Sequence, residues 1–201
     1  MTQQIEINID ELLAHIVENL PKNAAIDDPK GGNKSWTLHL KRLLENFGAL
    51  HYRLSSEYSD PSRHMSEFLI DFQWWDKRIE SRQQMVLAVE SEWYNLPAWV
   101  KDPGARYAED VAADFYKLMV IKSPYKLMTF SSDGGVNREL IVKRLERDTA
   151  SFVGHVKGER YILLDSSPND DWGAYELLIT EDGACAGHFL KREILSRGLS
   201  G

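Results

Sequence analysis

Apolar residues recur at helical spacing, three and four positions apart, in several stretches of the chain. Pro21 and Pro124 close two of these stretches, and Ser35 is a suitable N-cap for a helix that ends near Gly48. The pattern predicts helices over residues 5–20, 35–48, 105–122 and 136–149, and a final short helix over 189–199.

Between these helices lie shorter runs that are rich in β-branched, aromatic and aliphatic residues and that are bounded by Gly, Pro, Asn or Asp. They predict strands over residues 67–75, 84–94, 125–130, 159–165 and 174–180, while 49–58 fits a strand or a helix extension. Strands that alternate with helices in this order predict an α/β or α+β fold, with a mixed central β-sheet flanked by helices.

No linker rich in Gly, Ser or Pro divides the chain, so we expect a single domain over residues 1–201.

Six tryptophans are many for this length. We expect them to pack in the core, with a stacking surface for bases or sugars as the alternative. Cys185 is the only cysteine, which excludes an intramolecular disulfide and favours the cytoplasm. The acidic N-terminus does not resemble a signal peptide, and no apolar run is long enough for a membrane span.

The formal charge of −7 argues against broad electrostatic binding to nucleic acid, but it is compatible with a metal-dependent nuclease whose active site is acidic. Asp71 lies in one predicted strand, and Glu90 and Glu92 lie in the next. Two residues apart on a strand, the glutamates share one face, and a hairpin would bring Asp71 beside Glu90. Clustered carboxylates repel one another, and Mg²⁺ would relieve that repulsion. The alternative is a solvated sheet face whose acids pair with Lys or Arg.

These carboxylates stand in the segments LIDFQWWD, LAVESEW, DFYK and YKLMTF. Together the segments resemble the core of the PD-(D/E)XK restriction-endonuclease-like superfamily, and the resemblance covers residues 36–130. It implies a helix, a hairpin-rich mixed sheet, a further helix and a further strand. It also implies phosphodiester cleavage with Mg²⁺ or Mn²⁺, although some branches of the superfamily have other roles. Residues 1–35 would then be an N-terminal helix and loop, and 136–201 an extension of the same domain.

Under this resemblance, Asp71 is similar to the first acid of the motif and Glu90 to the second. Glu92 stands where the common pattern has lysine, and some restriction enzymes of the superfamily carry the same Glu-x-Glu. Lys117 or Lys126 could supply the positive charge instead, or Lys117 could simply pair with Asp114 or Asp110 on its own helix.

Glu45 and Glu57 are candidates for an additional metal-binding acid, with a surface role as the alternative for each. The basic residues Arg138, Lys143, Arg144 and Arg147 could touch phosphate or form a solvated helix face. The resemblance to the PD-(D/E)XK superfamily implies a nuclease that binds nucleic acid, DNA ahead of RNA, and that could act as a homodimer. The second hypothesis is an inactive acidic module that docks a basic protein partner. No membrane partner is expected.

Overall fold

The computed structural model describes residues 6–20, 33–49, 52–56, 70–76, 84–93, 100–132, 137–166, 172–183 and 187–194. The helices are α1 (Ile9–Asn19), α3 (Asn33–Gly48), α4 (Pro103–Val120) and α5 (Arg138–Ser151). The strands are β1 (Tyr52–Ser56), β2 (Phe72–Asp76), β3 (Met85–Glu92), β4 (Tyr125–Ser131), β5 (Arg160–Ser166), β6 (Gly173–Leu178) and β7 (Leu190–Arg192).

All seven strands form one sheet, and their order in the sheet is their order in the sequence. β1, β2 and β3 are antiparallel, β3, β4 and β5 are parallel, and β5, β6 and β7 are again antiparallel. The parallel pairs need crossover connections, which α4 and α5 provide. The predicted mixed sheet flanked by helices is therefore confirmed, and residues beyond 136 add three strands to that same sheet.

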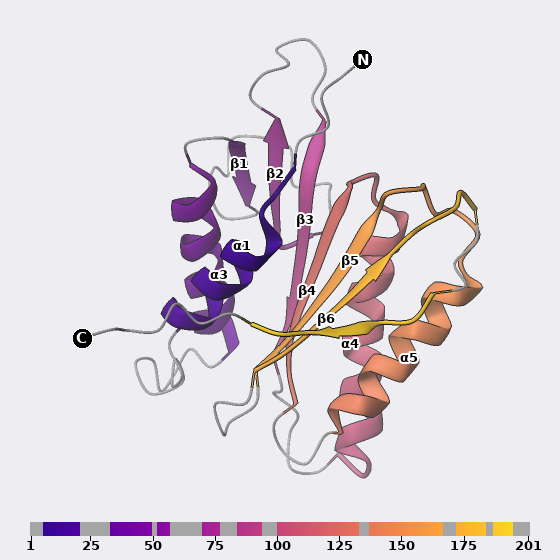
Figure 1. Ribbon diagram of the computed structural model, residues 1–201. Helices are drawn as coiled ribbons and strands as arrows, with labels where there is room; N and C mark the ends of the chain where they lie inside the picture. Colours follow the sequence, from indigo (N-terminus) through magenta and orange to yellow (C-terminus); the bar gives the residue numbers. More distant parts are fainter. Residues whose placement is uncertain are drawn as a thin grey trace.

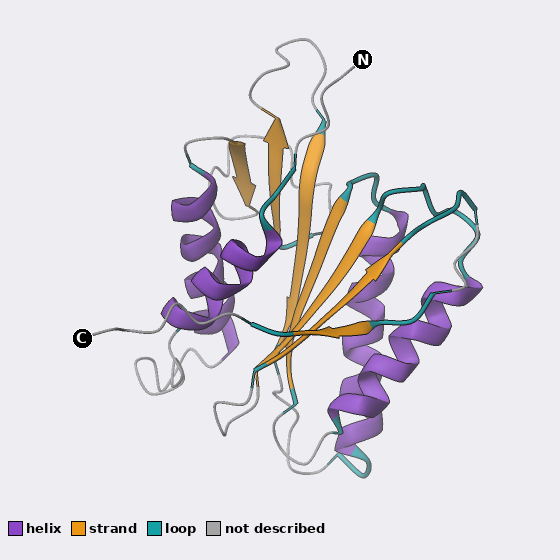
Figure 2. Ribbon diagram, viewed as in Figure 1, coloured by secondary structure: helices purple, strands orange, loops and turns teal. Residues whose placement is uncertain are grey.

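The helices cover the two faces of the sheet as separate layers (Figures 1 and 2). α1 and α3 lie on one face and α4 and α5 on the other. Each face has its own apolar core, because side chains alternate along every strand. Phe72, Trp74 and Val89 belong to the core under α1 and α3, and Ala88 and Met128 belong to the core under α4 and α5.

Polar caps explain where three of the helices begin. The side chains of Asn8, Asp102 and Asn137 each accept a hydrogen bond from a backbone N–H in the first turn of the helix that follows. Pro103 occupies the first turn of α4, where its missing N–H costs nothing. Ser35 is not an N-cap, since α3 already begins at Asn33.

The predicted helix over 189–199 is wrong within the described residues. Leu190 to Arg192 form β7 instead, which pairs with β6. Arg192 forms ion pairs with Glu176 on β6 and with Asp10 on α1. The pairing of Leu190 to Arg192 with β6 therefore outweighs the helical pattern of the local sequence.

The tryptophans mostly follow the packing interpretation. Trp74 and Trp93 are buried in the core under α1 and α3, and Trp36, Trp75 and Trp172 are partly buried against the two cores. Trp99 lies outside the described residues. Within the described part of the chain, no helix is both long enough and apolar enough to cross a membrane.

Candidate functional site

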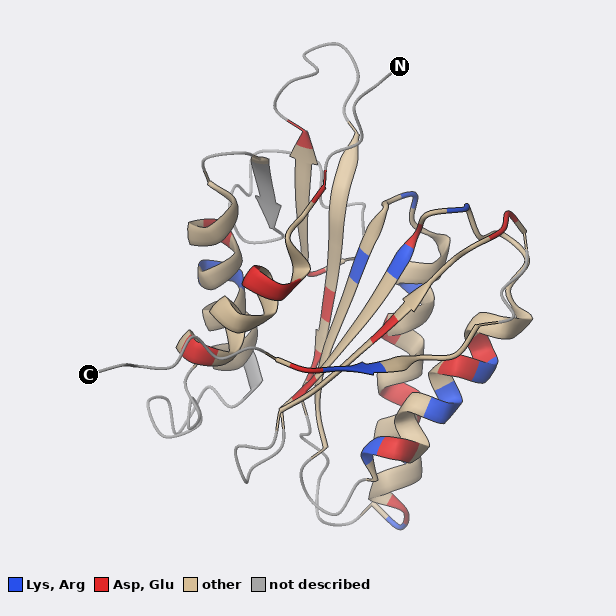
Figure 3. Ribbon diagram, viewed as in Figure 1, with Lys and Arg blue, Asp and Glu red and all other residues tan. Residues whose placement is uncertain are grey.

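Three of the predicted carboxylates, Asp71, Glu90 and Glu92, lie close enough together that Asp71 raises the pKa of both glutamates, and Figure 3 shows the acidic positions on β3 and α4 in red. Val89 and Trp93 belong to the core on the opposite face. Glu90 and Glu92 therefore face α4, as their spacing predicts. Glu90 is only 2% exposed and Glu92 is partly buried, so the face is not freely solvated there, but Glu90 and Asp71 do pair with lysines, as the alternative to a metal site predicts.

Asp71 lies in a bend directly before β2. Phe72 pairs with Val89, so the next position in register brings Asp71 to the level of Glu90. Asp71 Oδ2 accepts hydrogen bonds from the backbone N–H of Ser91 at 2.9 Å and from the Ser91 hydroxyl at 2.6 Å. These two bonds fix the carboxylate at the end of β3.

A second set of contacts ties this carboxylate to α3. The Ser91 hydroxyl lies 3.1 Å from Thr37 Oγ1, which accepts a hydrogen bond of 3.0 Å from Trp93 Nε1. Lys41 Nζ lies 3.6 Å from Asp71 Oδ1. α3 therefore orients Asp71 through both a hydroxyl relay and a positive charge.

Lys41 is a site residue that the sequence analysis missed. It is 3% exposed. A lysine is almost never buried to this degree unless a charged group pairs with it. A signal was present, because Lys41 falls on the same helical stripe as the buried residues Leu40 and Leu44. A charge on the inward stripe of a helix indicates a buried partner.

Lys117 approaches the site from α4. Its Nζ lies 2.6 Å from Asp114 Oδ1 and 3.5 Å from Glu90 Oε1. Burial lowers the pKa of Lys117, but Asp114 and Glu90 together raise it above its ordinary value. Lys117 therefore stays protonated. It pairs with Asp114, as one alternative predicts, and also lies within ion-pair distance of Glu90, while its catalytic role stays a prediction.

The two glutamates resist ionisation. Burial, and then the negative charge of Asp71, raise the pKa of Glu90 to about 9. Burial, and then Asp114, raise the pKa of Glu92 to about 8. Lys117 opposes the shift at Glu90 but does not cancel it, so both glutamates favour the neutral form at neutral pH, and a bound cation would favour the ionised form.

Lys126 is not brought to Glu90. On β4 it pairs with Ala88, whereas Glu90 pairs with Met128. Its Nζ instead donates to Tyr161 Oη at 3.0 Å and pairs with Glu159 at 3.0 Å. Burial lowers the pKa of Lys126 to about 8. Lys126 thus belongs to a separate buried cluster.

The two upstream acids are not joined to the site. Glu45 is partly buried on α3 and forms no hydrogen bond or ion pair with any described residue. Glu57 lies outside the described residues.

The donor atoms of the site suit a hard divalent cation. Among the described residues no three His, Cys, Asp or Glu side chains converge as ready metal ligands. Mg²⁺, however, is usually held by one or two carboxylates and completed by water and substrate phosphate. Glu90 Oε1 is buried and accepts no hydrogen bond from a described residue, with Lys117 at ion-pair distance only. A cation would satisfy this oxygen, with Glu90 as its ligand.

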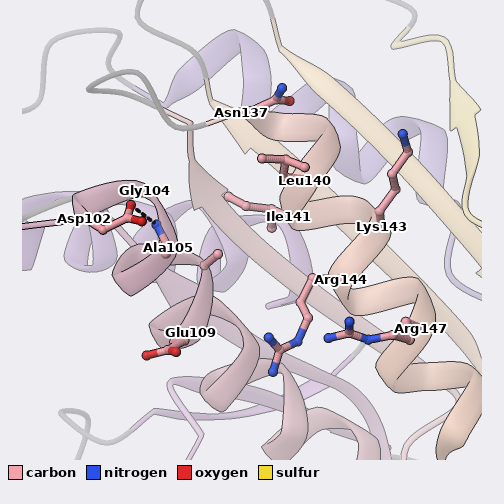
Figure 4. A pocket seen from close by; sticks show the side chains of 11 residues that line it. Asp102, Gly104, Ala105, Glu109, Asn137, Leu140, Ile141, Lys143, Arg144 and Arg147 are labelled. Carbon is pink, nitrogen blue, oxygen red and sulfur yellow. Dashed lines mark hydrogen bonds between the residues drawn. The ribbon is translucent and has the colours of Figure 1, made fainter.

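A separate open pocket of about 620 Å³ lies between the start of α4 and α5 (Figure 4). Glu109 of α4 and Lys143, Arg144 and Arg147 of α5 contribute to its lining, and none of the carboxylates of the site does. Three of the four predicted basic residues therefore line a pocket, although the Arg144 guanidinium donates to Asp148 at 2.6 Å. The fourth, Arg138, pairs with the buried Asp165 instead.

No protein-family model matches the chain, and no curated protein or solved structure matches it either.

Proposed function

We propose that the chain is a nuclease that hydrolyses phosphodiester bonds with Mg²⁺ or Mn²⁺. The observation that carries this proposal is the buried oxygen Oε1 of Glu90, which accepts no hydrogen bond from a described residue and lies 3.5 Å from Lys117 Nζ, with the charge of Asp71 close enough to raise the pKa of Glu90. Burying an acid beside another acid lowers the stability of the fold. Such groups are often found at functional sites. A cation site would explain why Glu90 is buried there.

The order of elements supports the same proposal. The PD-(D/E)XK resemblance implies a helix, a hairpin-rich sheet, a helix and a further strand, and α3, β1 to β3, α4 and β4 follow in that order. The candidate residues lie on β3 and the elements beside it, where the sheet changes from antiparallel to parallel pairing.

Each residue of the site has a role that fits its contacts. Glu90 and Asp71 would hold the cation, which when bound polarises a phosphate and activates water. Lys117 holds a positive charge beside Glu90 and would stabilise negative charge that develops on the phosphate. Glu92, with its pKa near 8, would hold or accept a proton close to neutral pH.

The burial of Glu90 favours this function over docking of a basic protein. A docking surface acts through exposed charge, and Glu90 exposes almost none. The substrate would be a nucleic acid, with DNA ahead of RNA, and the lone Cys185 fits a cytoplasmic protein.

Cleavage of plasmid DNA and of a structured RNA tests the proposal. The wild type should cleave at least one of them with Mn²⁺ or Mg²⁺ and not in chelator. Glu90→Gln and Asp71→Asn should each lower the rate by about 100-fold or more, because each removes a charge that holds the cation. Lys143→Ala, in the separate pocket, is the matched control and should cleave within a few-fold of wild type. Cleavage that survives in chelator, or in both carboxylate variants, would contradict the proposal.

A further inference from the structure

Gln73 is a second buried side chain that lacks a partner. It lies on β2 and is 4% exposed. Its carbonyl oxygen Oε1 accepts no hydrogen bond from any residue that the structure describes. Buried polar atoms are almost always paired, so an unpaired carbonyl oxygen in a strand is a feature that needs an explanation.

The position of Gln73 places it next to the carboxylate site. Its neighbours Phe72 and Trp74 belong to the core under α1 and α3, so Gln73 faces the other side of the sheet. It pairs with Ala88, and Glu90 is its diagonal neighbour on β3. Long side chains at diagonal positions of an antiparallel pair are within reach of each other.

Two buried oxygens without a hydrogen-bond donor, Gln73 Oε1 and Glu90 Oε1, therefore lie on neighbouring strands and on the same face. Carboxylate and carbonyl oxygens are the ligands that a hard cation takes, and the carbonyl of a glutamine side chain is a suitable neutral ligand. A neutral ligand also adds no repulsion to the acids already present.

We propose that Gln73 supplies an uncharged oxygen ligand to the divalent cation held by Glu90. The inference rests on the proposed function, because it assumes that a cation binds there. It adds a ligand from β2 that the motif resemblance does not contain.

Calorimetric titration of the metal-free full chain with Mn²⁺ tests this assignment without any assay of activity. Gln73→Leu should weaken Mn²⁺ binding by roughly 10- to 100-fold, the range typical for a residue that supports a metal site. Gln73→Glu should tighten it, because a carboxylate replaces the carbonyl at the same place. Gln84→Leu is the matched control, since Gln84 is exposed just before β3, and it should bind like wild type.

The outcomes separate the two proposals. Wild type that binds no Mn²⁺ overturns both the cation site and the role of Gln73. Wild type that binds Mn²⁺ while Gln73→Leu binds equally well overturns the role of Gln73 alone, even if that variant differs in stability. If Gln73→Leu does not fold, Gln73→Glu decides, and unchanged or weaker binding would overturn the assignment.

Discussion

Ionisation of Glu90 should make the stability of the metal-free protein depend on pH. Its pKa is about 9 in the folded chain, against an ordinary value of 4.5. The folded state therefore holds a proton that the unfolded state loses, and the unfolding free energy should fall as pH rises from about 5 to 9. Glu92 adds to the same trend, because its pKa is about 8.

Glu90→Gln should weaken this dependence. In chelator at pH 9, we expect the variant to be more stable than wild type by on the order of 1–3 kcal/mol, since it buries no charge. Urea unfolding at several pH values measures the slope. Glu109→Gln, an exposed position on α4, should keep the wild-type slope. Equal slopes in wild type and Glu90→Gln would show that Glu90 ionises normally.

Lys126 should contribute to the stability of the fold and not to the binding of the cation. It is fully buried and pairs with Glu159. Lys126→Met leaves this buried acid with only Tyr161 and His155 as polar side-chain partners among the described residues, and should cost roughly 3–5 kcal/mol. The double variant Lys126→Met with Glu159→Gln should recover most of this loss. Unfolding by urea measures both. A single variant as stable as wild type would contradict the ion pair.

At the scale of the element, α4 contributes a positive charge beside Glu90, as α3 does beside Asp71 through Lys41. Asp114 holds Lys117 at 2.6 Å one turn away, which keeps the ammonium group directed toward β3. Lys117→Met should lower cleavage by about 100-fold while the protein still binds Mn²⁺, because the lysine acts on developing charge and not as a ligand. Cleavage rates and calorimetric affinity measure the two effects. Loss of Mn²⁺ binding in this variant would place Lys117 in a structural role.

At the scale of the whole molecule, the parts of the fold that depend on local periodicity could be predicted from the sequence. The shared face of Glu90 and Glu92 follows from the two-residue repeat of a strand, and the mixed sheet follows from the order of elements. The strand at Leu190 to Arg192 could not be predicted, because it depends on pairing with β6.

The lysines of the site show the same limit. The sequence does not distinguish Lys117 from Lys126 as the positive charge beside the carboxylates. The register between β3 and β4 does, because it places Lys126 opposite Ala88 and not opposite Glu90. Lys41 pairs with Asp71 from α3, and Gln73 on β2 is the diagonal neighbour of Glu90, and no motif marks either of them. Spacing along one element predicts a face, but the residues that meet across elements depend on the tertiary structure.

Thermal unfolding with Mn²⁺, with Mg²⁺ and with chelator tests the central claim most directly, which is that Asp71 and Glu90 form a cation site. A ligand that binds only the folded state raises the melting temperature. We predict a metal-dependent rise in wild type that is absent in Glu90→Gln and strongly reduced in Asp71→Asn. No rise in wild type, or an equal rise in all three proteins, would contradict the account.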